Sequence, residues 1–198
     1  YKSYRDLISF SDAPFYLPHA YDNQGEGYAY GLDLFWRDKK TIKNGDYWVS
    51  YSFIETERQH REFPEMATPG FVSKHNLSVV YKHFITGWRS LPGATFTYGS
   101  PRRYDDPNTP AFNDATMPAF LSLDLNWTYL HRENIIFHAA VTNAPGFKQQ
   151  FGYRYADQPD ASGQYAATEI LPAARRFIIL GCFITLSQND RNQLDKIN

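Results

Sequence analysis

The sequence predicts an all-β fold, an antiparallel up-and-down meander of about eight long strands. Three observations predict it. Apolar and polar residues alternate in one segment after another, helix signals are nearly absent, and the links between the segments are alternately short and long. A period of two gives a strand one apolar face and one polar face. In a meander, alternating link lengths place every long loop at the same end of the sheet.

The expected strands follow one another along the whole chain. They are 1–10, 27–37, 46–56, 75–85, 94–100, 120–130, 134–143 and 175–187. Residues 1–10 form the weakest candidate. Residues 27–37 alternate well, except that Phe35 puts an aromatic ring on the otherwise polar face. The apolar set of this second strand is Tyr28, Tyr30, Leu32, Leu34 and Trp36.

The next three strands also show period-two alternation. Residues 46–56 set Tyr47, Val49, Tyr51 and Phe53 against Ser50 and Ser52, and residues 75–85 set Leu77, Val79, Tyr81 and Ile85 against Ser78 and Lys82. Residues 94–100 form a shorter candidate. Each is therefore expected to have one apolar face and one wet face.

The last three strands include the most regular one. Residues 120–130 alternate strictly, with Leu121, Leu123, Leu125, Trp127 and Tyr129 against Ser122, Asp124, Asn126 and Thr128. Residues 134–143 align Ile135, Phe137, Ala139 and Val141. Residues 175–187 are apolar on both faces, which is typical of a strand with little contact to water.

The links favour a barrel that crosses a membrane. The short ones read DKKTIKNG, TGWRSLPG and HREN, whereas the four long ones are rich in Pro, Gly, Asp and Asn. Outer-membrane barrels have this asymmetry, and their tilted strands need about 9–11 residues. We therefore expect the apolar face to contact lipid and the polar face to line a wet interior. The alternative is a soluble sandwich or a lipocalin-like barrel with the same faces turned inside out.

Composition limits the function classes. The chain has 198 residues and a formal net charge of −1, which argues against a nucleic-acid partner. Aromatic residues make up 17%, as the aromatic girdles of membrane barrels would require. The single cysteine, Cys182, excludes an internal disulfide. The sequence contains no run of about 18 apolar residues, so no membrane-spanning helix is predicted. The chain shows no signal peptide and no initiator Met, so we expect it to be the end of a longer protein.

Five stretches resemble the C-terminal barrel region of TonB-dependent outer-membrane receptors, in the form common among Bacteroidetes-type bacteria. These are GEGYAYGLDLFWRDKKTIKNGDYWVSYSFIETER, FVSKHNLSVVYKHFI, FHAAVTNAPG, FGYRYADQPDASG and ILPAARRFIILGCFITLS. The resemblance covers nearly all of the chain, and its specificity comes from the order of the five stretches.

The resemblance implies a barrel of ~22 strands, plugged by an N-terminal domain, that imports a scarce ligand such as an iron complex, a cofactor or a glycan. The implied partners are outer-membrane lipid, the missing plug and remaining strands, an inner-membrane energy-coupling complex and the imported small molecule. No catalysed reaction and no cofactor are implied. Residues 1–187 would supply barrel strands and extracellular loops of the C-terminal third, and 188–198 a polar tail.

Two loop clusters are candidate ligand contacts. Arginine suits forked hydrogen bonding to anions, and tyrosine suits stacking. The candidates are Arg102, Arg103, Tyr104, Tyr153, Arg154 and Tyr155. The alternative is that these residues order their loops. His131 and His138 flank a predicted turn and could approach each other, but no three or four converging ligands mark a metal site. Asp33 and Asp124 are expected to face the wet interior.

Overall fold

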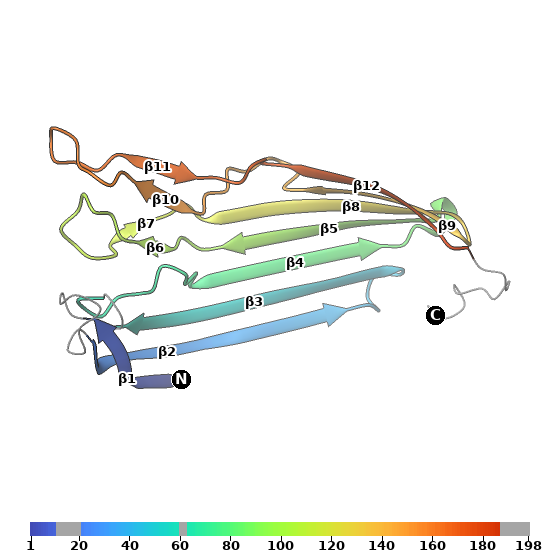
Figure 1. The fold of residues 1–198 in the computed structure, drawn as a ribbon. Helices are drawn as coiled ribbons and strands as arrows, with labels where there is room; N and C mark the ends of the chain where they lie inside the picture. Colours follow the sequence, from blue (N-terminus) through green and yellow to red (C-terminus); the bar gives the residue numbers. More distant parts are fainter. Residues whose placement is uncertain (11–20, 60–62, 187–198) are drawn as a thin grey trace.

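The computed structural model describes residues 1–10, 21–59 and 63–186. One sheet of eight antiparallel strands dominates it (Figure 1). The strands are β1 (Lys2–Phe10), β2 (Tyr21–Asp38), β3 (Gly45–Arg58), β4 (His75–His83), β5 (Ser90–Gly99), β8 (Phe120–Arg132), β9 (Ile135–Thr142) and β12 (Phe177–Ile184). Each pairs with its neighbour in sequence order, as the meander prediction required. No helix within the described ranges is long and apolar enough to cross a membrane.

Two small hairpins were not predicted. They are β6 (Arg103–Tyr104) with β7 (Ala115–Thr116), and β10 (Gly152–Tyr155) with β11 (Ala167–Ile170). Both lie inside long links, and both extend from the same end of the main sheet (Figure 1). The short links lie at the opposite end, so the predicted asymmetry is confirmed. The polar tail predicted at 188–198 lies outside the described residues.

One short link is shorter than expected. The segment TGWRSLPG was predicted as a link, but β5 already begins at Ser90. The chain reverses over the 3-10 turn η2 (Thr86–Trp88) because Arg89 adopts a left-handed conformation with φ 48°. Ile85 then pairs with Ser90 in an antiparallel bridge. The backbone reversal at a non-glycine residue gave no signal in the sequence.

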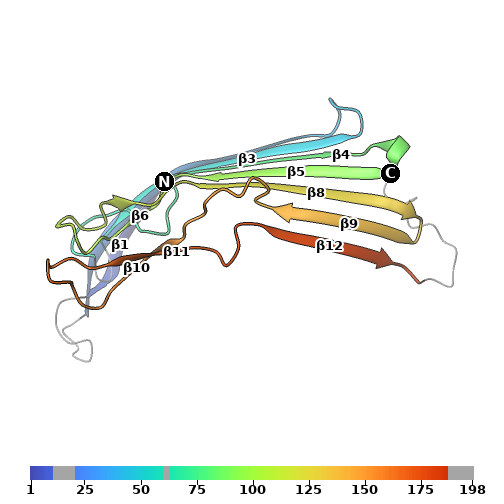
Figure 2. The same cartoon turned by 90° about the horizontal axis from the view of Figure 1, so that it is seen from above.

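The sheet is open. Strands β1 and β12 are its two edges, and no ladder joins them among the described residues. Figure 2 shows the strands side by side along one gently bent layer. The described chain therefore forms an open sheet rather than a small closed barrel.

The register places the alternating residues of neighbouring strands on common faces. Val49 pairs with Val79, Val79 with Phe96, and Phe96 with Leu123. One residue further along, Ser50 pairs with Ser78, continuing the polar face. All the residues predicted to point outward share the first of these faces, which we call the apolar face. They are Tyr28, Tyr30, Leu32, Val49, Tyr51, Leu77, Val79, Leu121, Leu123 and Leu125.

The apolar face is not covered by other protein. Tyr30, Leu32 and Leu125 are 45%, 54% and 41% exposed. The other predicted residues are half-buried rather than exposed, so the exposure of this face is smaller than expected. The reason is that neighbouring side chains on a pleated surface cover one another. None is buried in a core. The buried apolar side chains of the described chain are few, namely Ala29, Pro69, Val72, Val80 and Met117.

Aromatic side chains gather at both ends of the apolar face. Near the short turns, Trp36 contacts Tyr47 with ring centroids 5.1 Å apart, and Tyr129 stacks on Phe137 at 6.5 Å. Near the long loops, Tyr30 meets Phe53 at 6.2 Å. Mostly aliphatic residues lie between the two rows. On β8 the apolar run from Leu121 to Tyr129 extends about 27 Å at about 3.4 Å per residue.

Candidate ligand-binding site

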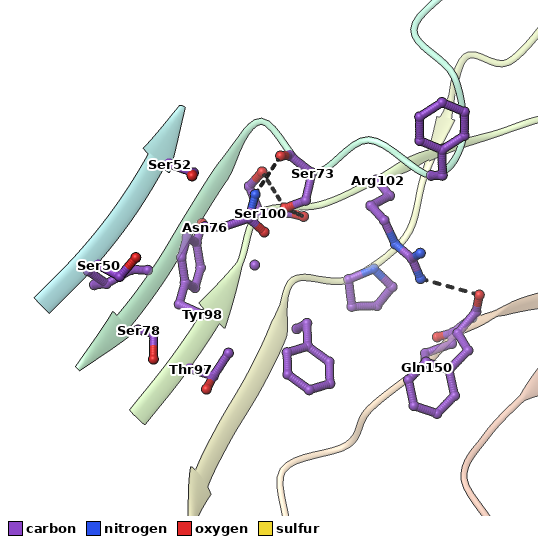
Figure 3. A pocket seen from close by; sticks show the side chains of 16 residues that line it. Ser50, Ser52, Ser73, Asn76, Ser78, Thr97, Tyr98, Ser100, Arg102 and Gln150 are labelled. Carbon is purple, nitrogen blue, oxygen red and sulfur yellow. Dashed lines mark hydrogen bonds between the residues drawn. The ribbon is translucent and has the colours of Figure 1, made fainter. Parts of the chain in front are cut away.

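A hollow of about 420 Å³ lies on the polar face next to the long loops (Figure 3). Its floor comes from small polar side chains on three adjacent strands, β3, β4 and β5. These are Ser50, Ser52, Asn76, Ser78 and Thr97. Small side chains at consecutive inward positions leave the floor low, whereas the loops rise around it. The floor offers neutral hydroxyl and amide groups that can both donate and accept hydrogen bonds.

The rim of the hollow is aromatic and carries one positive charge. Phe71 and Phe151 are 67% and 47% exposed, and Phe120 completes the aromatic set. Arg102 is the sole charged residue of the described lining, and its Nη2 donates to the Phe151 carbonyl oxygen at 3.4 Å. With one guanidinium and no carboxylate, this lining suits a neutral polar or anionic ligand and disfavours a cation.

A serine pair fixes the loop-side edge of the hollow. Ser73 donates to the Ser100 carbonyl oxygen at 3.0 Å (Figure 3). The Ser100 hydroxyl in turn accepts the amide N–H of His75 at 3.0 Å. Ser100 is 9% exposed. These bonds hold the start of β4 against the end of β5, and thereby hold the segment that carries Phe71. No motif in the sequence marks this pair.

The two predicted loop clusters meet in the structure. The rings of Tyr104 and Tyr153 lie 4.9 Å apart, and Tyr153 lies 6.3 Å from Tyr155. Burial raises the pKa of Tyr155 well above its ordinary value, and a hydrogen bond with Tyr104 adds to the effect. This contact joins the β5–β8 and β9–β12 links, a juxtaposition that neither cluster alone predicted.

The predicted arginines have three different environments. Arg102 lines the hollow. Arg103 forms an ion pair with Asp114 at 3.2 Å and donates to that residue's carbonyl oxygen at 2.5 Å, so it orders its own loop. Arg154 is exposed and has no carboxylate partner among the described residues. The structure thus separates one arginine that stabilises a loop from two whose guanidinium groups could reach a ligand.

Asparagines that the sequence reasoning missed tie the long loops together. Asn108 accepts the Tyr165 amide N–H at 2.7 Å and donates to its carbonyl oxygen at 3.1 Å. Asn113, with φ 52°, donates its side-chain amide to the Thr68 carbonyl oxygen. The sequence signal was present but general, since Asn is favoured in turns and tolerates left-handed backbone. The β3–β4, β5–β8 and β9–β12 loops are therefore tied to one another.

Asn143 explains the stretch FHAAVTNAPG. It is 2% exposed and left-handed, with φ 48°. Its side-chain amide donates to the carbonyl oxygens of Phe147 and Arg175, each at 2.8 Å, and its oxygen accepts the Phe147 N–H at 3.0 Å. Arg176 donates to the carbonyl oxygens of Ala144 and Pro145 at 2.8 and 2.7 Å. These family-like residues thus fold the link between β9 and β12.

The polar face holds both predicted interior carboxylates, but they are engaged rather than merely solvated. Asp33 accepts the Ser52 hydroxyl. Asp124 accepts the Ser122 hydroxyl at 2.6 Å and the Asn143 N–H at 2.8 Å. Asp124 therefore links the middle of β8 to the end of β9.

The suggested approach of His131 to His138 is wrong. His138 Nδ1 lies 2.9 Å from the Thr128 hydroxyl on the polar face, whereas the His131 ring lies 5.9 Å from that of Tyr129 on the apolar face. The β8–β9 register puts them on opposite sides of the sheet. His19 and His60 lie outside the described residues. No cluster of three metal-ligating side chains occurs in the part of the chain described.

Comparison with known proteins finds the same fold at low identity. No protein-family model and no curated protein matches the chain. The ferric-catecholate import receptor Fiu of E. coli K12 in its closed form matches with a TM-score of 0.61, 13% identity and 91% of this chain covered. The siderophore receptor PiuA of Acinetobacter baumannii matches at 0.62, 14% and 90%. The outer membrane transporter YddB of Escherichia coli matches at 0.55, 12% and 91%.

The chain spans only part of each of these proteins, 24% of the two receptors and 29% of the transporter. At these identities the likeness concerns the fold. The antiparallel meander of this chain has the fold of a segment of an outer-membrane receptor barrel.

Proposed function

We propose that this chain is the C-terminal wall and extracellular-loop segment of a TonB-dependent outer-membrane transporter, as found in Bacteroidetes-type bacteria. Its strands would contact lipid on the apolar face and the interior of a large barrel on the polar face. The remaining strands and an N-terminal plug would complete the receptor. An inner-membrane complex would supply the energy for import. The segment itself catalyses no reaction.

The observation that carries this proposal is the uncovered apolar face. It runs across neighbouring strands, has an aromatic row at each end, and backs onto a face of serine, threonine, asparagine and aspartate. A soluble monomer rarely exposes an apolar patch above a few hundred Å². A membrane barrel needs an outward band about 25 Å tall between aromatic girdles. The open edges β1 and β12 further support a segment of a larger wall.

The self-contained lipocalin-like barrel has less support. That reading needs the apolar side chains to meet inside a closed barrel, with β1 paired to β12. In the described chain these strands are edges, and the apolar side chains form one open layer. The rim of the hollow is aromatic, but its floor is hydroxylated, which disfavours a purely apolar ligand.

The ligand would be a small polar or anionic molecule received from the long-loop side. Arg102 at the rim and Arg154 beyond it would attract negative charge, and the aromatic rim would stack on flat groups. Arg103, Tyr104, Tyr153 and Tyr155 would act by holding the loops in place. The likeness to receptors described as ferric-catecholate and siderophore receptors makes iron complexes the first ligands to test.

Lipid contact can be measured at two adjacent residues. In the full-length protein with Cys182→Ala, single cysteines are placed at Val49 on the apolar face or at Ser50 on the polar face, and each is labelled with a fluorophore. In vesicles containing brominated acyl chains, the label at 49 should be strongly quenched and the label at 50 should not. The label at 50 should instead be quenched by iodide in the aqueous phase.

The same pair of variants can refute the proposal. Equal lipid quenching at both positions would mean that the two faces are not divided between lipid and water. Protection of position 49 from lipid, together with a soluble monomeric product, would favour the lipocalin-like barrel instead.

A further inference from the structure

We infer that the apolar face carries a site for an anionic phospholipid on β8, β9 and β12, near the short-turn end of the sheet. This inference rests on the proposed membrane location but goes beyond the transport role. It combines a groove that fits an acyl chain with two arginines, Arg89 and Arg132, that fit a phosphate.

The groove is a depression of about 390 Å³ in the apolar face. It forms because Ala139 is small while the surrounding side chains are large. Leu125 and Trp127 border it on β8, Val141 on β9, and Ile178 on β12. Ala139 pairs with Trp127 on one side and with Leu180 on the other, so the depression crosses the strands. An acyl chain lying there would restore the contacts that the missing side-chain volume leaves unmade.

The cations lie at the short-turn end of the sheet, Arg132 at the end of β8 and Arg89 in the β4–β5 link. Arg89 Nη1 donates to the His131 carbonyl oxygen at 3.5 Å, so its guanidinium lies next to β8. Arg132 pairs with Ile135, which puts it on the apolar face after a bulge at His131. Arg89 and Arg132 are exposed, and neither forms an ion pair among the described residues, although Glu133 follows Arg132. Two guanidinium groups without carboxylates suit a phosphate.

The distance between the groove and the two arginines, measured along the membrane normal, matches the hydrocarbon thickness of one leaflet. Measured on β9, which has no bulge, Val141 at the far end of the groove and Ile135 opposite Arg132 are six residues apart, about 20 Å at about 3.4 Å per residue. With a barrel tilt of about 40°, this is about 15 Å along the membrane normal. That equals half of the roughly 30 Å hydrocarbon core. An acyl chain in the groove would therefore place its headgroup phosphate level with the two arginines.

Aromatic residues complete the site. Trp88 is 71% exposed beside Arg89, and the His131 ring lies 5.9 Å from the rings of both Tyr129 and Phe137. Tryptophan and tyrosine favour the level of the headgroups, where one end of the side chain is apolar and the other is wet. The lysines of the β2–β3 turn lie at the same end of the sheet, but the hollow of about 560 Å³ beside them is lined by the polar turn residues Arg37 to Thr41 and not by an apolar strand face, which makes them a suitable comparison.

The test is native mass spectrometry of the full-length protein, released from detergent with phosphatidylglycerol or phosphatidylethanolamine. Wild type should retain phosphatidylglycerol preferentially. One basic residue near an anionic headgroup changes affinity about fivefold. The double variant Arg89→Gln/Arg132→Gln should therefore bind phosphatidylglycerol about 25-fold more weakly. Lys39→Gln/Lys40→Gln removes equal charge at another turn and should change binding less than twofold.

A second set of variants tests the groove separately from the arginines. Ala139→Leu or Ala139→Phe fills the depression and should lower phosphatidylglycerol retention at least fivefold, with folding checked by heat-dependent migration in electrophoresis. Competition by inorganic phosphate distinguishes a lipid from a free anion. Full displacement by phosphate, with no effect of either substitution at 139, would overturn the lipid assignment. Equal losses in the arginine and lysine variants would also overturn it. Failure of lipid to quench position 49 would refute the membrane location itself.

Discussion

Replacing Asn143 tests whether one buried side chain organises the β9–β12 link. In Asn143→Ala, three hydrogen bonds disappear, two to carbonyl oxygens and one from the Phe147 N–H. At roughly 1 kcal/mol each, this costs about 3 kcal/mol. The left-handed backbone, with φ 48°, adds about 1 kcal/mol for alanine. We expect the free energy of unfolding to fall by about 4 kcal/mol.

Asn143→Gly is the matched control. Glycine loses the same three hydrogen bonds but accepts a positive φ without strain. Its cost should therefore be about 3 kcal/mol, and the difference between the two variants isolates the backbone term. The assay is urea unfolding of the full-length protein in lipid vesicles, followed by tryptophan fluorescence.

Hydrogen exchange of the peptide 143–176 shows where the loss occurs. Faster exchange should be concentrated in this link and at the start of β12, since Asn143 holds the Arg175 carbonyl oxygen. A cost below about 1 kcal/mol for Asn143→Ala, the net worth of a single hydrogen bond, would refute the reasoning. So would an unchanged exchange rate in the link.

Three further outcomes are expected. Leu123→Arg should destabilise the protein in vesicles by about 2–4 kcal/mol, because it puts a charge on the apolar face. Ser50→Arg, on the polar face next to Val49, should cost less than about 0.5 kcal/mol. Equal costs in urea unfolding would contradict the assignment of faces. Tyr104→Ala should cost about 0.5–1.5 kcal/mol for the lost ring contact with Tyr153 and should speed proteolysis of both hairpin loops, which a tie within one loop would not do. The pKa of Asp160 is held below its ordinary 3.8 by the Ser162 hydroxyl and then by the amides of Gln164 and Ser162, so its support of the turn is complete above that value and is lost as pH falls through the lowered pKa. Hydrogen exchange at 160–164 should accelerate on acidification in wild type and be independent of pH, after correction for intrinsic rates, in Asp160→Asn.

The candidate site was only partly predictable. Arg102 was among the candidates because arginine suits forked hydrogen bonding to anions. The serine and threonine floor of the hollow was present in the alternation as polar-face residues. The shape of the hollow could not be predicted from the alternation. It depends on the register, which decides which polar residues of β3, β4 and β5 lie opposite one another. The role of Arg103 was also invisible, since its partner Asp114 lies across a hairpin that the sequence did not predict.

The sequence by itself determined the strand faces, the approximate strand number and the ends at which long and short links lie. These follow from a period of two and from link length, which are local properties of the chain. Only the tertiary structure decided the bulge at His131, the meeting of Tyr104 with Tyr153 and the bonds of Asn108 to Tyr165. Such contacts join residues far apart in sequence, and their geometry depends on register and loop path. No local pattern records either, because each is fixed by packing against parts of the chain that lie elsewhere.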